Sequence, residues 1–121
     1  MPIGLAVAVA GAAGALARYL LDFYAGDHME PHHQVYVTFA INIAGSLLLG
    51  GLIGLHPDGK LRVIVGVGFL GAFTTFSTLM AQIYHYLDRD QYSHALLLPL
   101  LSVVAGVAAV YAGILAGRQL A

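Results

Sequence analysis

Residues 66–80 combine side chains that a purely apolar segment does not need. Gly66, Gly68 and Gly71 come first, and a run of threonine, serine and phenylalanine follows. Glycine lowers helix stability by roughly 1 kcal/mol relative to alanine, and hydroxyl groups compete for backbone hydrogen bonds. The stretch therefore predicts a locally broken helix, whose freed carbonyl oxygens are suitable ligands for a bare hard cation.

Hydrogen-bond donors without charge form a second candidate site in and beside this stretch. The edge of a phenylalanine ring is weakly positive, so Phe73 and Phe76 can face an anion without holding it irreversibly. The Asn42 amide and the hydroxyls of Ser77 and Thr78 would add donors. Such a set suits a small, strongly hydrated anion that must enter and leave. The alternative, that the rings fill a core and the hydroxyls join helices, stays open.

Asn42 belongs to a line of polar residues. Thr38, Asn42 and Ser46 are spaced four residues apart, which places them on one side of an otherwise apolar helix. A buried amide has two donor hydrogens that must be paired. Asn42 therefore either joins two helices or faces a polar pathway, and the line of three favours the pathway. Gly50 and Gly54, further along, have the spacing of small residues at close helix contacts.

The composition is that of a membrane protein. The 121 residues are 60% hydrophobic and 9% charged, with a mean hydropathy of +0.83, whereas a soluble domain carries about 25% charged residues. The chain has no cysteine, which excludes a disulfide framework, a zinc-thiolate site and a thiol nucleophile. Five scattered Lys and Arg and a net charge of -1 argue against nucleic acid as a partner.

A helix needs about 20 residues to cross about 30 Å of hydrocarbon, so the chain allows four spans and no soluble module. We expect an all-α fold with a single four-helix transmembrane domain and a third helix broken in mid-membrane. The predicted helices cover residues 2–24, 35–55, 61–86 and 93–118, and Pro99 is expected to interrupt the last one. In the first helix, Gly4, Gly11, Gly14 and Arg18 share a face suited to close packing.

The positive charges give little preference for one orientation in the membrane. Four spans place Lys60, Arg62 and Arg118 on one side, and Arg18 and Arg89 on the other. Three against two hardly biases insertion under the positive-inside rule. A chain that inserts in both orientations would show such a count, and it would allow an antiparallel homodimer.

Two motifs attract attention without supporting a site. A polar loop over residues 26–34 holds His28, His32 and His33, which are metal-ligand types, but no helical spacing fixes them, so a solvated loop is the simpler interpretation. Residues 66–72 match the dinucleotide pattern G-x-G-x-x-G/A. That pattern requires a βαβ unit, and the apolar chain that follows does not provide one.

Three segments resemble the helix motifs of the Fluc (CrcB-type) fluoride channels. They are residues 11–19 (GAAGALARY), residues 38–50 (TFAINIAGSLLLG) with Asn42 and Gly45, and residues 68–78 (GFLGAFTTFST). The similarity extends over the whole chain in length and order. The resemblance implies a dual-topology antiparallel homodimer in the cell inner membrane, with two pores that export fluoride passively and protect the cell from its toxicity.

The resemblance also implies roles for particular residues. The backbone carbonyls of Gly71 and Thr74 from both subunits would hold a structural Na+ that is not transported. Phe76 would present its ring to fluoride, Asn42 would donate to it, and Ser77 and Thr78 would extend the polar path. Residues expected at a vestibule or in support are Arg18, which would pair with Asp22, together with Thr38, Ser46, Phe73, Thr75, Leu79 and Ser102.

The chain departs from the family pattern at two places. Leu79 stands where the family usually has a second pore phenylalanine, which puts the complete pair of ring contacts in doubt. The fourth helix offers only Ser102 and Tyr111 as polar side chains for the path.

Two other classes of protein fit less well. A small proton-coupled multidrug exporter has similar size and span number but needs a titratable carboxylate inside its first helix. Asp22, the only acid there, lies near the end of that span. An intramembrane enzyme would need a nucleophile beside a base, and Ser77 has no histidine within one helical turn. We therefore expect a channel and no catalytic residue.

Overall fold

The chain folds into four long helices. The computed structural model describes the backbone of residues 2–28 and 34–121, and side chains except those of residues 26–28. The spans are α1 (Ile3–His28), α2 (Gln34–Gly54), a third that runs over Gly59–Asp88, and α6 (Tyr92–Leu120). All four are long and apolar enough to cross a membrane. The prediction of an all-α fold with four such helices is confirmed.

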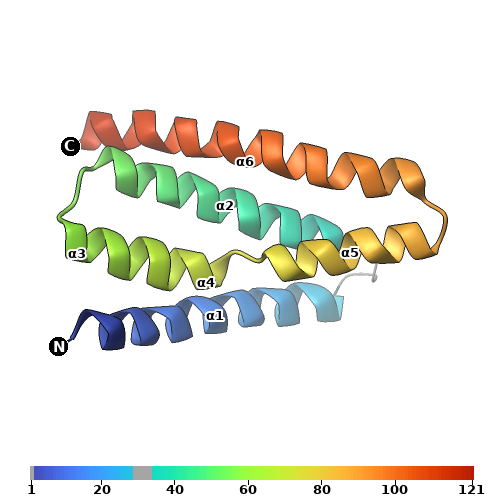
Figure 1. Cartoon of the computed structure of the whole chain (residues 1–121), viewed down its shortest axis with the longest axis horizontal. Coiled ribbons are helices and arrows are strands. Elements are labelled where there is room, and N and C mark those ends of the chain that lie inside the picture. The colour runs from blue at the N-terminus through green and yellow to red at the C-terminus, as the bar shows by residue number, and fades with distance from the viewer. Residues whose placement is uncertain (1, 29–33) are drawn as a thin grey trace.

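The third span is made of several pieces. It begins with α3 (Gly59–Leu61), continues as a π-helical segment (Arg62–Leu70) and α4 (Gly71–Phe73), and resumes as α5 (Phe76–Asp88). Between α4 and α5 the backbone is extended. Thr74 has φ -79° and ψ 159°, and Thr75 has φ -143° and ψ 114°. Figure 1 shows this interruption about halfway along the bundle. The predicted break is confirmed, although Gly71 itself is helical.

The helices lie side by side, and both termini and the turn from α2 to α3 lie at one end of the bundle (Figure 1). In Figure 1, α2 lies between α6 and the third span, and α1 lies on the other side of that span. The two termini and the turn from α2 to α3 share one end of the bundle, as four spans require. The closest packing joins α2 to α6 and α1 to the π-helical segment.

Glycines allow α2 and α6 to touch through their backbones. A Cβ on Gly50 would overlap the carbonyl of Val110, and one on Gly54 would overlap the carbonyl of Ile114. The predicted close contact at these two glycines is therefore confirmed. From α6, Gly113 and Gly117 meet the backbone of α2 in the same way.

The face of α1 predicted for close packing is used over part of its length. A Cβ on Gly14 would overlap the carbonyl of Phe69, and one on Gly11 would lie 3.6 Å from the Gly68 carbonyl oxygen. Among the described residues, no atom outside the backbone of α1 lies within 4 Å of a Cβ built on Gly4. The prediction is confirmed for Gly11 and Gly14 and wrong for Gly4, which lies near the open end of the helix.

The ends of the helices differ from the prediction in two respects. α1 continues to His28 and α2 begins at Gln34, so the loop is shorter than the nine residues predicted over 26–34. Residues 29–33 with His32 and His33, and the side chain of His28, lie outside the described part. Pro99 lies inside α6 without ending it, and the expected interruption there is wrong. Neighbouring helices and local adjustments re-satisfy the carbonyl that proline frees in a membrane helix.

Candidate ion site at the helix break

Asn42 of α2 holds the break open. Its Oδ1 accepts a hydrogen bond from the backbone N–H of Thr75 at 2.8 Å, and its Nδ2 donates to the Thr75 carbonyl at 3.2 Å. The side-chain amide thus pairs with a peptide group as another peptide would. Gly45, one turn further along α2, makes the approach possible because a Cβ there would collide with the Thr74 methyl group. Asn42 joins two helices, which was one of the two interpretations of its sequence position.

Thr75 starts the second half of the broken span. Its hydroxyl accepts from the backbone N–H of Thr78 at 3.2 Å and donates to the Thr78 Oγ1 at 3.0 Å. This is an N-cap, which stabilises a helix start by about 1 kcal/mol. Thr75 is only 7% exposed, so its backbone and side-chain groups are all paired inside the protein.

The break leaves carbonyl groups without their helical partners. The Thr75 N–H, which would pair with Gly71 in a continuous helix, goes to Asn42, and the Thr78 N–H, which would pair with Thr74, goes to the Thr75 hydroxyl. Within residues 2–28 and 34–121, no other hydrogen bond reaches the Gly71 or Thr74 carbonyl. Unpaired carbonyls at membrane depth are tolerated where they line a cavity or bind a cation.

Arg18 of α1 forms a hydrogen bond to a third carbonyl at the break, after those of Gly71 and Thr74. Its Nε donates to the Ala72 carbonyl oxygen at 3.2 Å. Hydrogen bonds to charged groups contribute about 1.5–3 kcal/mol, so this contact is a substantial part of what holds α1 against the break. The structure therefore places Arg18 in support of the broken span.

A cavity of about 320 Å³ lies beside the break. It is half open on the surface of the subunit, and every side chain that lines it is uncharged. The polar residues around it come from α2, the broken span and α6. The lining residues are Asn42, Gly45, Ser46, Leu49, Gly66, Leu70, Gly71, Thr74, Thr75, Phe76, Leu79, Ser102 and Val103.

The cavity brings together most, but not all, of the predicted site residues. Phe76 is 73% exposed at its rim, whereas Phe73 is buried and stacks on Phe69 at 5.9 Å between ring centroids. Phe73 is therefore a core residue in the structure. Ser77 is exposed, and both Ser77 and Thr78 lie on the first turn of α5, outside the cavity lining.

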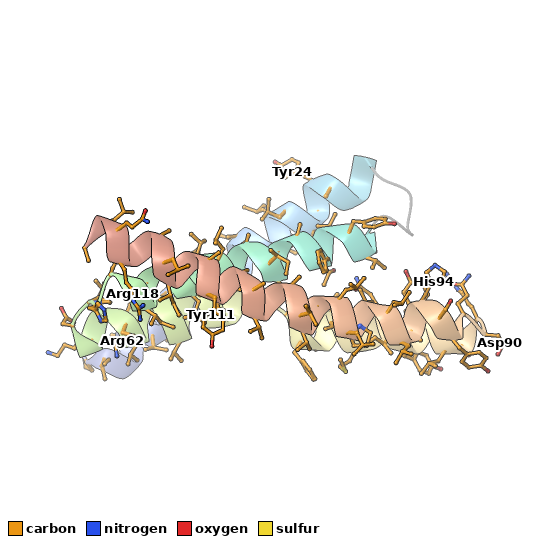
Figure 2. The ribbon with its side chains drawn as sticks, turned by 90° about the horizontal axis from the view of Figure 1, so that it is seen from above. Tyr24, Arg62, Asp90, His94, Tyr111 and Arg118 are labelled. Atoms are coloured by element: carbon orange, nitrogen blue, oxygen red, sulfur yellow. The ribbon has the colours of Figure 1, made fainter. Side chains whose placement is uncertain are left out.

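The two polar candidates on α6 lie in different surroundings. The Ser102 hydroxyl is buried at the cavity and is one of the buried side-chain groups of the described chain that have no hydrogen-bond partner. Tyr111 is 66% exposed and projects from the side of α6 in Figure 2. Of these two polar residues of α6, Ser102 lines the cavity of its own subunit and Tyr111 does not.

Gln82 is a polar residue of the site region that the sequence prediction missed. Its Nε2 donates to the Oγ1 of Thr38 at 2.8 Å, and its Oε1 is buried without a partner. Gln82 follows Thr78 by four residues, so the two share a face of α5, and it follows Thr75, the cap of that helix, by seven. That spacing was the available signal. The α2 line that begins at Thr38 thus meets a matching polar line on α5.

A second cavity continues from Gln82 toward the end of the bundle. It has a volume of about 340 Å³ and a polar lining, made by Gln34, Val35, Gln82, His85, Tyr86, Arg89 and Gln91. The polar lines of α2 and α5 therefore lead from the break to a polar opening. Among the described residues, no cluster of three His, Asp or Glu could bind a metal through side chains.

Known proteins resemble the chain over most of its length. A family model described as "CrcB-like protein, Camphor Resistance (CrcB)" matches residues 5–114. The chain belongs to the CrcB family. This confirms the resemblance that the helix motifs indicated.

Curated relatives of this CrcB-family chain carry names that state a transport function. A protein of Symbiobacterium thermophilum named "Fluoride-specific ion channel FluC 1" is 40% identical over 92% of this chain and 94% of its own length. A "Fluoride-specific ion channel FluC" of Phenylobacterium zucineum is 42% identical over 95% of this chain and 94% of its own. One of Bordetella avium is 43% identical over 75% and 73%. These relatives are ion channels, so the prediction that the chain is not an enzyme is confirmed.

Proposed function

We propose that this CrcB-family protein is a fluoride-selective channel through which fluoride leaves the cell passively, which protects the cell from fluoride toxicity. The cavity at the helix break carries the proposal. It sets uncharged donors and a phenylalanine ring side by side at a depth where the span is interrupted. The names of the relatives, which span nearly the whole chain, support fluoride as the ion.

The donors around the cavity suit a small anion. Asn42 uses one hydrogen of its Nδ2 on Thr75, which leaves the second for an ion in the cavity. Ser102 brings a buried hydroxyl that has no partner in the described part of the subunit, and Phe76 brings a ring edge. Because none of these groups is charged, they replace part of a hydration shell without holding the ion tightly, as conduction requires.

We further propose that the freed carbonyls of Gly71 and Thr74 bind a structural Na+, which is not transported. Both residues line the cavity, and both carbonyls lack a hydrogen bond within the described subunit. Hard cations take oxygen ligands, and two carbonyls from one chain are too few. A second copy would double them. The ion would supply positive charge at the contact between the two copies.

We also propose a homodimer, which the same surface supports. The cavity is half open, and the exposed Phe76 ring lies at its rim in the middle of the span. A second copy placed there would close the cavity and complete the carbonyl set. The antiparallel, dual-topology arrangement is proposed from the family resemblance. The charge count supports dual topology less than the sequence suggested. Arg18 binds Ala72 inside the bundle, so it no longer counts as a charge at a membrane surface. Three cations then remain on one side and one, Arg89, on the other.

Anion efflux from liposomes tests the channel. Vesicles that contain the purified protein and potassium fluoride are expected to release fluoride when valinomycin is added, and vesicles loaded with potassium chloride are expected to retain chloride. Absence of fluoride efflux, or equal release of chloride, would contradict the proposal. Phe76→Ala is expected to reduce the efflux while the dimer persists on a sizing column.

Two further experiments test the cation and the orientation. Fluoride efflux is expected to disappear when sodium is replaced on both sides of the vesicle, and full activity in sodium-free buffer would exclude a required Na+. The chain has no cysteine, so Ser93→Cys provides a single label at an exposed position in the first turn of α6. Dual topology predicts that an impermeant thiol reagent labels about half of the chains in intact cells. Labelling of all or none would refute it.

The proposed location is the cell inner membrane, crossed several times by each chain. The four apolar helices and the channel relatives support a multi-pass membrane protein. Fractionation of cells that express a tagged chain should recover it with the inner membrane.

A further inference from the structure

A third cavity lies on another side of the bundle, between α2, α6 and the π-helical segment. Its volume is about 440 Å³ and its lining is almost wholly apolar. We propose that this groove binds an anionic phospholipid, with an acyl chain in the groove and the phosphate against Arg62 and Arg118. The lining residues are Leu47, Leu48, Gly51, Leu52, Leu55, Val65, Phe69, Leu70, Gly113, Ala116, Gly117 and Leu120.

The groove has the depth of one leaflet. Its wall on α2 runs from Leu47 to Leu55, which is about 12 Å at a rise of 1.5 Å per residue. Half of the hydrocarbon core is about 15 Å. Leu48, Leu55 and Leu120 are 55%, 46% and 80% exposed, so the groove opens to the membrane. An extended acyl chain fits along most of its length.

Positive charge gathers where the groove ends. Arg118 follows the groove residue Gly117 in α6, and Arg62 precedes the groove residue Val65 by about one turn. Both arginines are exposed, and Figure 2 shows them at the same end of the bundle. The backbone nitrogen of Arg118 would lie 3.0 Å from a Cβ on Gly54, so α2 and Arg118 meet at this point.

The ionisable residues of that end favour a phosphate group. Lys60 adds a third cation, and the Asp58 carboxylate is engaged by the Leu61 N–H at 2.8 Å as the cap of α3. Guanidinium groups bind phosphate oxygens in a bidentate manner. An apolar groove of leaflet depth that ends in two guanidinium groups matches the two halves of an anionic phospholipid.

Lipid association measured by electron paramagnetic resonance tests the site. The full chain is reconstituted in phosphatidylcholine vesicles that contain spin-labelled phosphatidylglycerol or, separately, spin-labelled phosphatidylcholine. The immobilised fraction is expected to be larger for phosphatidylglycerol. Arg62→Gln and Arg118→Gln should each reduce that preference roughly fivefold. Arg89→Gln, a matched change at the opposite end, should leave it unchanged.

Filling the groove tests the acyl chain. Ala116→Phe adds a ring inside the groove, and Leu115→Phe adds one at an exposed neighbouring position outside it. Only the first should lower the immobilised fraction. Gly51→Ala provides a second, smaller filling variant if the ring prevents folding, because the nearest described atom outside the backbone of α2, the Gly113 carbonyl oxygen, lies 3.9 Å from a Cβ there.

Three outcomes would overturn the proposal. They are equal immobilisation of the two lipids by the unaltered chain, a preference that survives both arginine changes, and an Ala116→Phe variant that loses its dimer but keeps its lipid. The last result would assign the groove to a second copy of the chain. The variants lie outside the cavity at the break, so fluoride flux does not enter the readout.

Discussion

Replacing Asn42 by leucine tests whether this residue holds the break as well as the ion. The change removes two hydrogen bonds to Thr75, at 2.8 and 3.2 Å. If each is an ordinary bond between membrane helices, the loss is about 1 kcal/mol in all, at about 0.6 kcal/mol each. If the Thr75 peptide groups stay unpaired, the loss is about 2–6 kcal/mol. Thr75 is 7% exposed, so water cannot compensate fully and we expect more than 2 kcal/mol.

The released Thr75 N–H has one helical acceptor within reach, the Gly71 carbonyl four residues earlier. If that bond forms, the break shortens and a carbonyl of the proposed cation site is lost. Asn42→Leu should therefore reduce both thermal stability in detergent, followed by circular dichroism, and sodium-dependent fluoride efflux. Ser46→Ala is the matched control for the stability measurement, since in the described chain the Ser46 hydroxyl donates to the Asn42 carbonyl of its own helix, at 2.8 Å. It is no control for efflux, because Ser46 lines the cavity.

The two readouts separate the roles of Asn42. Loss of efflux with unchanged stability would show that the Thr75 contact contributes little and that the structural reasoning is wrong. Unchanged values of both would refute the structural and the ion-binding role together.

Three other substitutions address neighbouring contacts. Gly14→Ala should lower the free energy of unfolding by about 1–3 kcal/mol, because its methyl group meets backbone, whereas Gly4→Ala, with open space, should not; equal melting curves would contradict the packing argument. Arg18→Gln should cost about 1.5–3 kcal/mol by weakening the bond to Ala72, and an unaltered thermal midpoint would show that this bond is dispensable. Leu79→Phe should raise fluoride efflux by adding a second ring at the cavity while lowering stability by about 1–3 kcal/mol, since Leu79 is 8% exposed; slower efflux would refute the first half.

The sequence was sufficient to predict four spans and a broken third one, because hydrophobic length and the density of glycine and hydroxyl residues are local properties. It named two causes for the break, glycines and hydroxyl groups, and the structure supports the second, because the Thr75 hydroxyl accepts from the Thr78 N–H at the break. The glycines have other roles. Gly68 serves to approach Val7 and Ala10 of α1, and Gly71 is helical. The extended residues are Thr74 and Thr75, whose geometry depends on Asn42, 33 positions away. No local pattern encodes such a distant pairing.

Two further features were out of reach for the same reason. The π-helical winding before the break has no distinctive composition, and tight contact with α1 accompanies it. Gln82 was missed because a single polar residue near the end of an apolar span is common, and only its bond to Thr38 shows that it belongs to the polar line. The line on α2 was visible because three residues repeated at one spacing.

The pairing of Asn42 with Thr75 also bears on how the protein assembles. A span that enters the membrane alone has no access to α2, so its Thr75 N–H can pair only within its own helix, and a continuous helix is then the stable form. The interruption becomes favourable once α2 has docked and its amide replaces the intrahelical bond. We therefore expect membrane insertion to precede formation of the break, and the freed carbonyls to appear when the bundle docks. A chain caught between these stages would cross the membrane four times and have no ion site.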